Sequence, residues 1–260
     1  MVGGKVLTKK TPEDFAKMLV AGRCVAAVHE AVRAVIRPGA TTSQLDAVAA
    51  EVTRKHGCRP SFLGYHGFPG TICTSPNSAI VHGIPGDYTL RDGDLISIDA
   101  GAIYEGWHGD AAFTMAVGDV PKEVQRLLDA TEEALWNGLR QAKVGKRLGD
   151  IGDAIQSTAE PYGYGVVREY VGHGIGRQMH EAPNVPNYGT PGRGLKVKTG
   201  MALAIEPMFN LGGSDTAVLE DEWTVVTADG SLSAHFEHTV LITEDGPVVS
   251  TLPEPLALDQ

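Results

Sequence analysis

Four acidic residues stand where ionised side chains are costly. Asp99 ends the apolar segment LISID, and Glu206 ends the similar segment LAIE. Each is followed by a second acid shortly before a threonine, Asp110 in the first half of the chain and Glu237 in the second. Taken singly, each acid could face water at a strand end or pair with an arginine, because a buried carboxylate needs compensation. Four that converge cannot all be ionised without cations, and two divalent metals would balance their charge.

One histidine could complete a metal site with these acids. His173 lies in the segment GHGIG, where the glycines allow a close approach of the backbone. The alternative is a loop histidine that hydrogen-bonds to the backbone. Oxygen-rich ligation with one imidazole favours Mn, Fe(II), Co or Zn over metals that thiolates select. Two bridged ions would lower the pKa of a shared water and polarise a carbonyl, which is the chemistry of hydrolysis.

The segments that must position these residues alternate between helical and strand-like patterns. Helix start signals and apolar periodicity predict helices over residues 12–36, 41–57, 121–142 and 148–162. Short apolar segments bounded by Gly, Asp or Pro predict strands over residues 95–102, 111–117, 201–209, 222–227 and 236–243. Two helices followed by strands, twice over, favour an α+β domain with segregated layers.

The two halves of the chain also resemble each other locally. Residues 93–99 and 200–206 each consist of a glycine, five mostly apolar residues and an acid. Short strand patterns can coincide by chance, so this repeat alone is a weak signal. Together with the paired acids it predicts an internal duplication with a pseudo-twofold relation.

Composition and charge restrict the class of protein. The 260 residues are 42% hydrophobic and 21% charged, as in globular proteins, and the net charge is -10, which argues against a general nucleic-acid binder. No apolar run predicts a membrane span, and the first ten residues lack the apolar core of a signal peptide. Three cysteines far apart suggest neither a disulfide framework nor a zinc site. We therefore expect a cytoplasmic protein.

The chain closely resembles the type I methionine aminopeptidases from its first helix to Thr243. The resemblance is carried by SIDAGAIYEGWHGDAAFT, GHGIGRQMHE, AIEPM and FEHTV, a combination far more specific than any one of them. It implies the pita-bread fold, a curved antiparallel sheet backed by two helix pairs. It also implies five ligands to two metal ions: Asp99, Asp110, His173, Glu206 and Glu237. In that family Asp110 and Glu237 bridge the ions, Asp99 chelates one, and His173 and Glu206 bind the other.

Two further histidines match the family's catalytic residues. His82 lies in HGIP, and His180 follows His173 by seven positions. The resemblance implies that both contact the substrate, at the scissile amide and the tetrahedral intermediate, and that Glu206 acts in catalysis as well as in metal binding. Without the resemblance, a structural histidine would be the simpler interpretation of each.

A set of mostly aromatic residues matches the part of the family that binds the methionine side chain: Tyr65, Phe68, Cys73 and Trp223. Ordinary core packing explains their spacing equally well. Phe62 and Met179 stand where close relatives often carry Cys and Phe, so both supply apolar wall while the width of the pocket differs. Aromatic rings around a flexible thioether are physically sensible.

The resemblance implies an aminopeptidase that removes the first methionine of nascent chains when the second residue is small. It also implies a monomer, with at most transient ribosome contact. We expect residues 11–252 to form one catalytic domain, with an N-terminal extension at 1–10 and a tail at 253–260. Prolidases and related enzymes usually carry a large extra N-terminal domain, and type II methionine aminopeptidases carry an insertion for which residues 206–237 are too short. A non-catalytic binding protein on the same fold would be expected to lose ligands.

Overall fold

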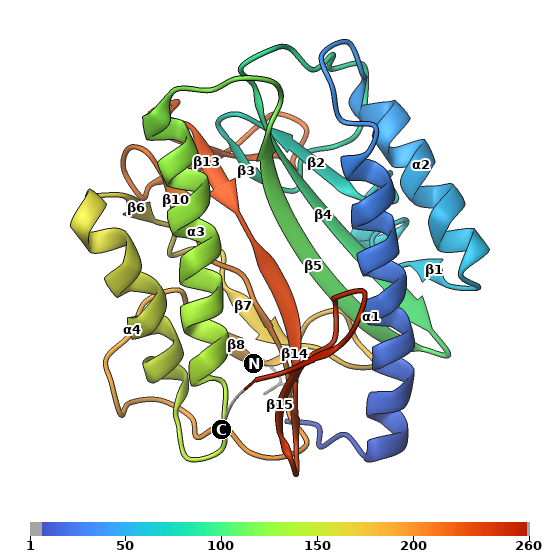
Figure 1. The fold of residues 1–260 in the computed structure, drawn as a ribbon, viewed down its shortest axis with the longest axis vertical. Coiled ribbons are helices and arrows are strands. Elements are labelled where there is room, and N and C mark those ends of the chain that lie inside the picture. Colours follow the sequence, from blue (N-terminus) through green and yellow to red (C-terminus); the bar gives the residue numbers. More distant parts are fainter. Residues whose placement is uncertain (1–6, 259–260) are drawn as a thin grey trace.

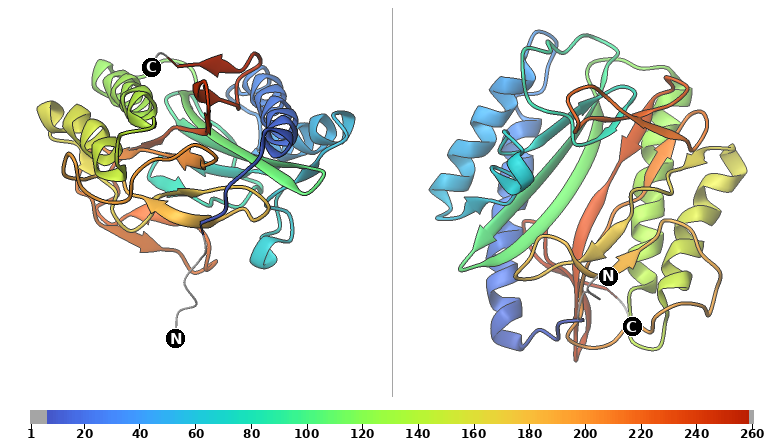
Figure 2. Two further views of the ribbon diagram at one scale, coloured as in Figure 1. Left: turned by 90° about the horizontal axis from the view of Figure 1, so that it is seen from below. Right: turned by 180° about the vertical axis from the view of Figure 1, so that it is seen from behind.

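The computed structural model describes residues 7–258, so the predicted extension at 1–10 and tail at 253–260 lie partly outside the described residues. A curved, mainly antiparallel sheet has a pair of helices on either side of its middle (Figure 1). Both helix pairs lie on the same side of this sheet, and its other side is covered by loops and short strands (Figure 2). The predicted α+β class with two helix pairs is confirmed.

The four predicted helices are present, and their start signals act as expected. They are α1 (Pro12–Arg33), α2 (Thr42–Lys55), α3 (Lys122–Gln141) and α4 (Leu148–Ala159). Thr11 and Thr41 each form a capping box, in which the threonine hydroxyl accepts from the third helical N–H and that residue's side chain accepts in return. The fourth helix is shorter than predicted, because a 3₁₀ turn, η2 (Glu160–Tyr162), replaces its last turn at Pro161.

The sheet residues form one large and two small sheets. The large sheet contains β1 (Arg59–Pro60), β2 (Cys73–Pro76), β4 (Leu95–Tyr104), β5 (Trp107–Ala116), β7 (Gly172–Gly174), β8 (Glu181–Val185), β9 (Ala202–Ile205), β14 (Glu237–Thr243), β15 (Gly246–Val249) and β16 (Leu256–Ala257). The small sheets contain β6 (Gly165–Val166), β10 (Met208–Asn210) and β13 (Ser233–His235), and β3 (Ala79–Val81), β11 (Thr216–Val218) and β12 (Val225–Thr227). A further 3₁₀ turn, η1 (Tyr65–Gly67), precedes β2.

The strand order explains how the two halves meet. Along the path β1-β4-β5-β14-β9-β7-β8, the first-half hairpin β4–β5 lies beside the second-half pair β14 and β9. β5 and β14 are antiparallel neighbours at the junction. Helix α1 packs on β4 and β5, while α3 packs on β9 and β14. The duplicated arrangement predicted from the repeat is therefore the architecture of the molecule.

One predicted strand was wrong in a way that matters for the site. Residues 201–209 form two strands, β9 and β10, that belong to different sheets. The chain leaves the large sheet at Glu206 and Pro207, and a proline cannot donate a ladder hydrogen bond. The strand predicted over 222–227 begins only at Val225, and Glu222 has a positive φ of 63°.

Helix α1 approaches the sheet closely at a pair of glycines. A Cβ at Gly22 would lie 2.2 Å from the carbonyl oxygen of Ser250, and one at Gly109 would lie 2.9 Å from the backbone nitrogen of Gly22. Glycine at 109 therefore lets β5 approach α1 next to Asp110, and glycine at 22 lets α1 approach Ser250, which follows β15. Among residues 7–258, no helix is both long and apolar enough to cross a membrane.

Candidate metal centre and active site

Strand register brings four of the predicted ligands to one face of the large sheet. Asp99 on β4 and Glu237 on β14 both pair with Ala112 of β5, so all three occupy one row and point the same way. Asp110 lies two residues from Ala112 on the same strand, which returns it to that face. His173 on β7 pairs with Ala204 of β9, which pairs in turn with Thr239, two residues beyond Glu237 on β14, so His173 lies on the same face.

The fifth predicted ligand reaches the same face from the end of β9. His238 pairs with Ile205, so alternation places Glu206 opposite Glu237 as the strand ends. The other face of these strands is the one that packs on the helices. The register thus places the acids on the face opposite the helices, and Figure 2 shows that this side of the sheet carries no helix pair.

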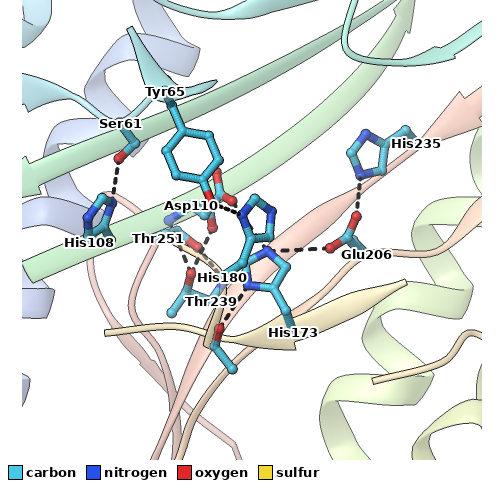
Figure 3. A network of polar contacts seen from close by, with 11 residues as sticks. Ser61, Tyr65, His108, Asp110, His173, His180, Glu206, His235, Thr239 and Thr251 are labelled. Atoms are coloured by element: carbon cyan, nitrogen blue, oxygen red, sulfur yellow. Dashed lines mark hydrogen bonds and ion pairs between the residues drawn. The ribbon is translucent and has the colours of Figure 1, made fainter. Parts of the chain in front are cut away.

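Asp110, His173 and Glu237 are buried, Asp99 and Glu206 are half-buried, and the side chains lie close together. Ligand atoms of Asp110, His173 and Glu237 all lie within 4.8 Å of one another. His173 Nε2 is 3.6 Å from Glu206 Oε1 and 3.9 Å from Asp110 Oδ2 (Figure 3). His173 Nδ1 donates to the Gly174 carbonyl oxygen at 2.9 Å, which directs Nε2 toward the carboxylates.

The two halves are tied together by the threonines that follow the acids. Thr239 Oγ1 donates to the backbone oxygen of Asp110 at 2.8 Å, so it bonds from the second half to the first. Thr114 Oγ1 donates to the backbone oxygen of His235 at 2.8 Å, from the first half to the second. These reciprocal bonds fix the junction of β5 with the second half at the level of the acids.

Burial disfavours the charged form of all four carboxylates. Burial raises the pKa of Asp99 to about 7, and burial with the charge of Asp99 raises the pKa of Glu206 to about 8. Burial and the neighbouring acids raise the pKa values of Asp110 and Glu237 well above their ordinary range. Such a cluster favours any cation that can neutralise it.

The donor set fits divalent metal ions. Asp99 Oδ1, Asp110 Oδ1 and Glu237 Oε1 are buried and have no hydrogen-bond partner among the described residues. Unpaired buried carboxylate oxygens are costly, and a metal ion would satisfy all three at once. Carboxylate oxygens with one imidazole suit first-row divalent metals.

The two predicted catalytic histidines lie at the same cavity, which has a volume of about 280 Å³. His82 follows β3 with a φ of 61°, and its ring lies edge-on to Tyr170 at 5.8 Å between centroids. Burial lowers the pKa of His82. The next residue, Gly83, leaves no room for a Cβ, which would come within 2.2 Å of the Thr74 carbonyl oxygen. The turn therefore holds His82 tightly against β2.

His180 approaches from the loop between β7 and β8. The Tyr65 hydroxyl lies 2.8 Å from His180 Nδ1, and the His180 and His173 rings are 4.3 Å apart between centroids. Figure 3 shows His180 and His173 side by side, between Tyr65 and Glu206. A residue that the resemblance assigns to the reacting carbonyl is thus beside a predicted metal ligand.

The residues predicted to hold a methionine side chain form the apolar wall of the cavity. They are Phe62, Tyr65, Phe68, Cys73, Met179 and Trp223. Phe68 packs edge-on against Phe62 and Trp223, at 6.5 Å and 5.2 Å between centroids. Burial, with the charge of Asp99, raises the pKa of Cys73. The wall is therefore neutral, beside an acidic floor.

Some cavity residues were not predicted from the sequence. Tyr170 and Glu169 line its edge, and His235 lies beside the acids with Nε2 3.8 Å from Glu206 Oε2 (Figure 3). His235 Nε2 is buried and has no hydrogen-bond partner among the described residues. The sequence signal that could have marked His235 is its position two residues before Glu237, a predicted ligand. Nothing in the local pattern marks Tyr170, which reaches the cavity from a loop.

Comparison with known proteins agrees with this geometry. Residues 16–244 match the model of metallopeptidase family M24. The chain is 52% identical over 237 residues to methionine aminopeptidase 1 of Bacillus subtilis (strain 168), covering 91% of this chain and 96% of the relative. The crystal structure of a methionine aminopeptidase from Thermotoga maritima superposes with a TM-score of 0.93 at 45% identity, covering 95% of this chain and 100% of that one.

A prolidase from Pyrococcus furiosus shares the fold more distantly. Its TM-score is 0.77 at 24% identity, and the match covers 95% of this chain but 66% of the prolidase. That likeness shows the fold alone. Because the family model spans most of the chain and the close relatives match over nearly their full length, the chain belongs to metallopeptidase family M24 and, within it, to the type I methionine aminopeptidases.

Proposed function

We propose that this chain is a methionyl aminopeptidase that uses two divalent metal ions and removes the first methionine of new proteins when the second residue is small. The observation that carries the proposal is the juxtaposition of four buried or half-buried acids and His173 with a cavity walled by aromatic rings, Cys73 and Met179. The acids can hold the metal ions that hydrolysis requires, and the apolar wall can accommodate an unbranched thioether side chain.

The division of ligands between the two ions follows the family resemblance. Asp110 on β5 and Glu237 at the start of β14 would be shared by both ions. Asp99 would complete one ion site from β4, and His173 with Glu206 would complete the other. When bound, the ions supply Lewis acidity for the scissile carbonyl and an activated water for attack on it.

The protein's own residues would then position the substrate and move protons. The apolar wall holds the methionine side chain and sets the first peptide bond over the acids. Glu206, which bound metal would keep ionised, can accept a proton from the attacking water. His82 donates a hydrogen bond to the amide nitrogen as it becomes an amine. His180, whose Nδ1 is held by Tyr65, stabilises the oxygen that gains negative charge.

The setting of this activity is also proposed. Nascent N-termini in the cytoplasm are the substrates, met through at most transient ribosome contact. The enzyme acts as a monomer, with residues 11–252 as one catalytic domain. Mn, Fe(II), Co and Zn all suit the donor set, so the metal in the cell is a matter for measurement.

The test is purification without oxygen, metal analysis and turnover of Met-Ala-Ser. Chelation is expected to abolish release of methionine, and Mn(II), Co(II) or Fe(II) to restore it. Met-Ala-Ser should be cleaved faster than Met-Leu-Ser, since the second side chain has limited room. Norleucine should be partly accepted, because one methylene discriminates by roughly 1–3 kcal/mol. Full turnover without metal, or cleavage only before proline, would refute the proposal, the latter in favour of a prolidase-like activity.

A further inference from the structure

A buried ion pair outside the proposed chemistry joins the N-terminal segment to the active-site loop. Lys10 and Glu181 are 4% and 7% exposed, and Lys10 Nζ lies 2.8 Å from Glu181 Oε2. Thr8 Oγ1 also donates to Glu181 Oε2 at 2.5 Å, and Lys10 Nζ lies 2.7 Å from Thr8 Oγ1. Burying two charges costs free energy unless each is compensated by the other and by further hydrogen bonds. The Lys10–Glu181 pair has such bonds, and we therefore looked for a specific role for it.

The Glu181 carboxylate fills the inside of the turn that carries His180. Its Oε1 accepts from the backbone N–H of Gln178 at 3.1 Å. A Cβ at Gly176 would come within 2.7 Å of both Glu181 Oε1 and Lys10 Cε. The turn from residue 176 to residue 181 is thus wrapped around the ion pair, and Met179 and His180 project from it into the cavity.

Both ends of this arrangement are anchored to regular structure. Lys10 N–H donates to the Gly200 carbonyl oxygen at 2.8 Å, and Thr11 next to it caps α1. On the loop side, the His108 N–H of β5 donates to the Gly176 carbonyl oxygen at 2.9 Å. In Figure 2 the blue segment that leads into α1 passes beside the gold strands β7 and β8. The first-half helix therefore reaches the second-half loop through Lys10.

We propose that Lys10 is a positioning residue for His180. By pairing with Glu181 it sets the turn at 176–181, and this holds the His180 ring at the Tyr65 hydroxyl and beside the acids. The inference rests on the proposed function, since His180 must contact the reacting substrate for its placement to affect turnover. It assigns a role to the described part of the N-terminal extension, residues 7–10.

The charge state of Glu181 agrees with this arrangement. Burial alone would raise the pKa of Glu181, but hydrogen bonds from Lys10 and Thr8 outweigh it, so the pKa is lowered. The carboxylate is therefore ionised at neutral pH. Removing Lys10 would leave it buried without its cation, and the turn would have to open to bring Glu181 to water.

The test compares Lys10→Met with Lys17→Met. Lys17 lies on α1, and its Nζ forms an exposed ion pair with Glu105 Oε2 at 3.0 Å. Misplacing a reacting group by an ångström can cost about 10²-fold, so we expect Lys10→Met to lower kcat for Met-Ala-Ser at least tenfold. Metal content should not change. Hydrogen exchange of the amides at 176–181 should rise in Lys10→Met and stay at the wild-type level in Lys17→Met.

The decisive comparison repeats both variants in a His180→Ala background. If Lys10 acts through His180, Lys10→Met costs little further kcat once His180 is absent. A purely structural role would lower the melting temperature equally in both backgrounds and leave no such coupling in kcat. An equal loss of kcat in both backgrounds, or wild-type kcat in Lys10→Met, overturns the proposal.

Failure of the proposed function and failure of the proposed role of Lys10 give different results. If Lys10→Met does not fold, the double variant Lys10→Met with Glu181→Gln removes the uncompensated charge, and the same loss of kcat and the same dependence on His180 are expected of it. If metal-loaded wild-type protein does not release methionine at all, the proposed function fails. Unchanged exchange at 176–181 in an active Lys10→Met variant would instead refute only the role of Lys10.

Discussion

Asp110 and Glu237 face each other across the junction of β5 and β14, and each has a buried oxygen with no partner among the described residues. In metal-free protein their charges are destabilising, because burial and the neighbouring acids raise both pKa values. A neutral residue of the same shape should therefore raise the stability of the metal-free protein and lower that of the metal-bound protein.

Asp110→Asn should melt at or above the wild-type temperature without metal, since it removes a buried carboxyl whose ionisation is unfavourable. It should gain little from added Mn(II), whereas wild type should gain about 2.7 kcal/mol at a hundredfold excess over its dissociation constant. Release of methionine should be lost. Glu254→Gln, which removes an exposed acid, is the control and should match wild type. Denaturation of each variant with and without metal measures these effects. If metal stabilised Asp110→Asn as much as wild type, Asp110 would not be a metal ligand.

We predict that His82 acts in the reaction and does not bind metal. Its ring lies against Tyr170 and Trp223 instead of among the acids, and Gly83 fixes the turn that carries it. Positioned proton donors contribute typically about 10²–10⁴-fold in rate. His82→Ala should lower kcat by that order while metal content and KM stay near wild type.

The matched control for His82 is His56→Ala, which alters an exposed histidine at the end of α2. Metal content, melting temperature and kcat are to be measured on the same preparations. Loss of metal would make His82 a ligand. Unchanged kcat with a lowered melting temperature would make it a structural residue.

At the scale of elements, the predicted helices agree with the structure because their signals are local. Thr11 and Thr41 cap α1 and α2 with side chains three residues away, and such signals can be read directly from the sequence. The break at Glu206 was missed because it depends on where the chain goes next. β9 continues in the large sheet, while β10 pairs with β6 and β13 in another. The apolar residues on both sides of the break hide this change of partner, although Pro207 is itself a signal against a continuous strand.

The close approach of α1 to Ser250, which follows β15, gives a prediction in which two effects on stability oppose each other. Alanine stabilises a helix interior by about 1 kcal/mol relative to glycine. At Gly22, however, the new Cβ would meet the Ser250 carbonyl oxygen at 2.2 Å, and backbone cannot move aside easily. Overpacking typically costs about 1–3 kcal/mol, so Gly22→Ala should be destabilised in urea denaturation.

Gly138→Ala in α3 is the matched control for this effect. Its Cβ would lie 3.0 Å from Ile155 Cδ1 and 2.9 Å from Ile155 Cγ1, in a side chain that can shift. The loss of stability at Gly138 should therefore be clearly smaller than at Gly22. Equal effects at the two positions would show that helix propensity, rather than the contact with Ser250, governs Gly22.

At the scale of the whole molecule, the duplication made the site predictable. Acids at corresponding positions of two similar halves imply that the halves meet, and β5 and β14 do meet beside Asp110 and Glu237. The cavity wall was predicted only through the family resemblance, since Phe62 and Trp223 come from distant loops without a common period. The pair of Lys10 with Glu181 spans 171 positions, and no local pattern could reveal it.

The pH dependence of stability should differ between metal-free and metal-bound protein. In metal-free protein the pKa of Asp99 is raised to about 7 and that of Glu206 to about 8, against about 4 in the unfolded chain. Groups with raised pKa values stabilise the fold at low pH and lose that contribution as pH rises through the folded pKa. Burial acts oppositely on His29, lowering its pKa to about 3, so its contribution is lost as pH falls below about 6.5.

Above pH 6.5 the histidine contribution is constant and only the acids act. The metal-free protein should therefore lose stability between roughly pH 6.5 and 8.5, at up to about 1.4 kcal/mol per pH unit for each proton released on unfolding. Bound metal holds the acids ionised, so metal-loaded protein should show no such loss, and loading near pH 7 should release protons. Urea denaturation at three pH values, and calorimetry in two buffers of different ionisation enthalpy, measure both effects. Metal-free stability that is flat or rises over this range, with no proton release on loading, would contradict a cluster of acids kept neutral by burial.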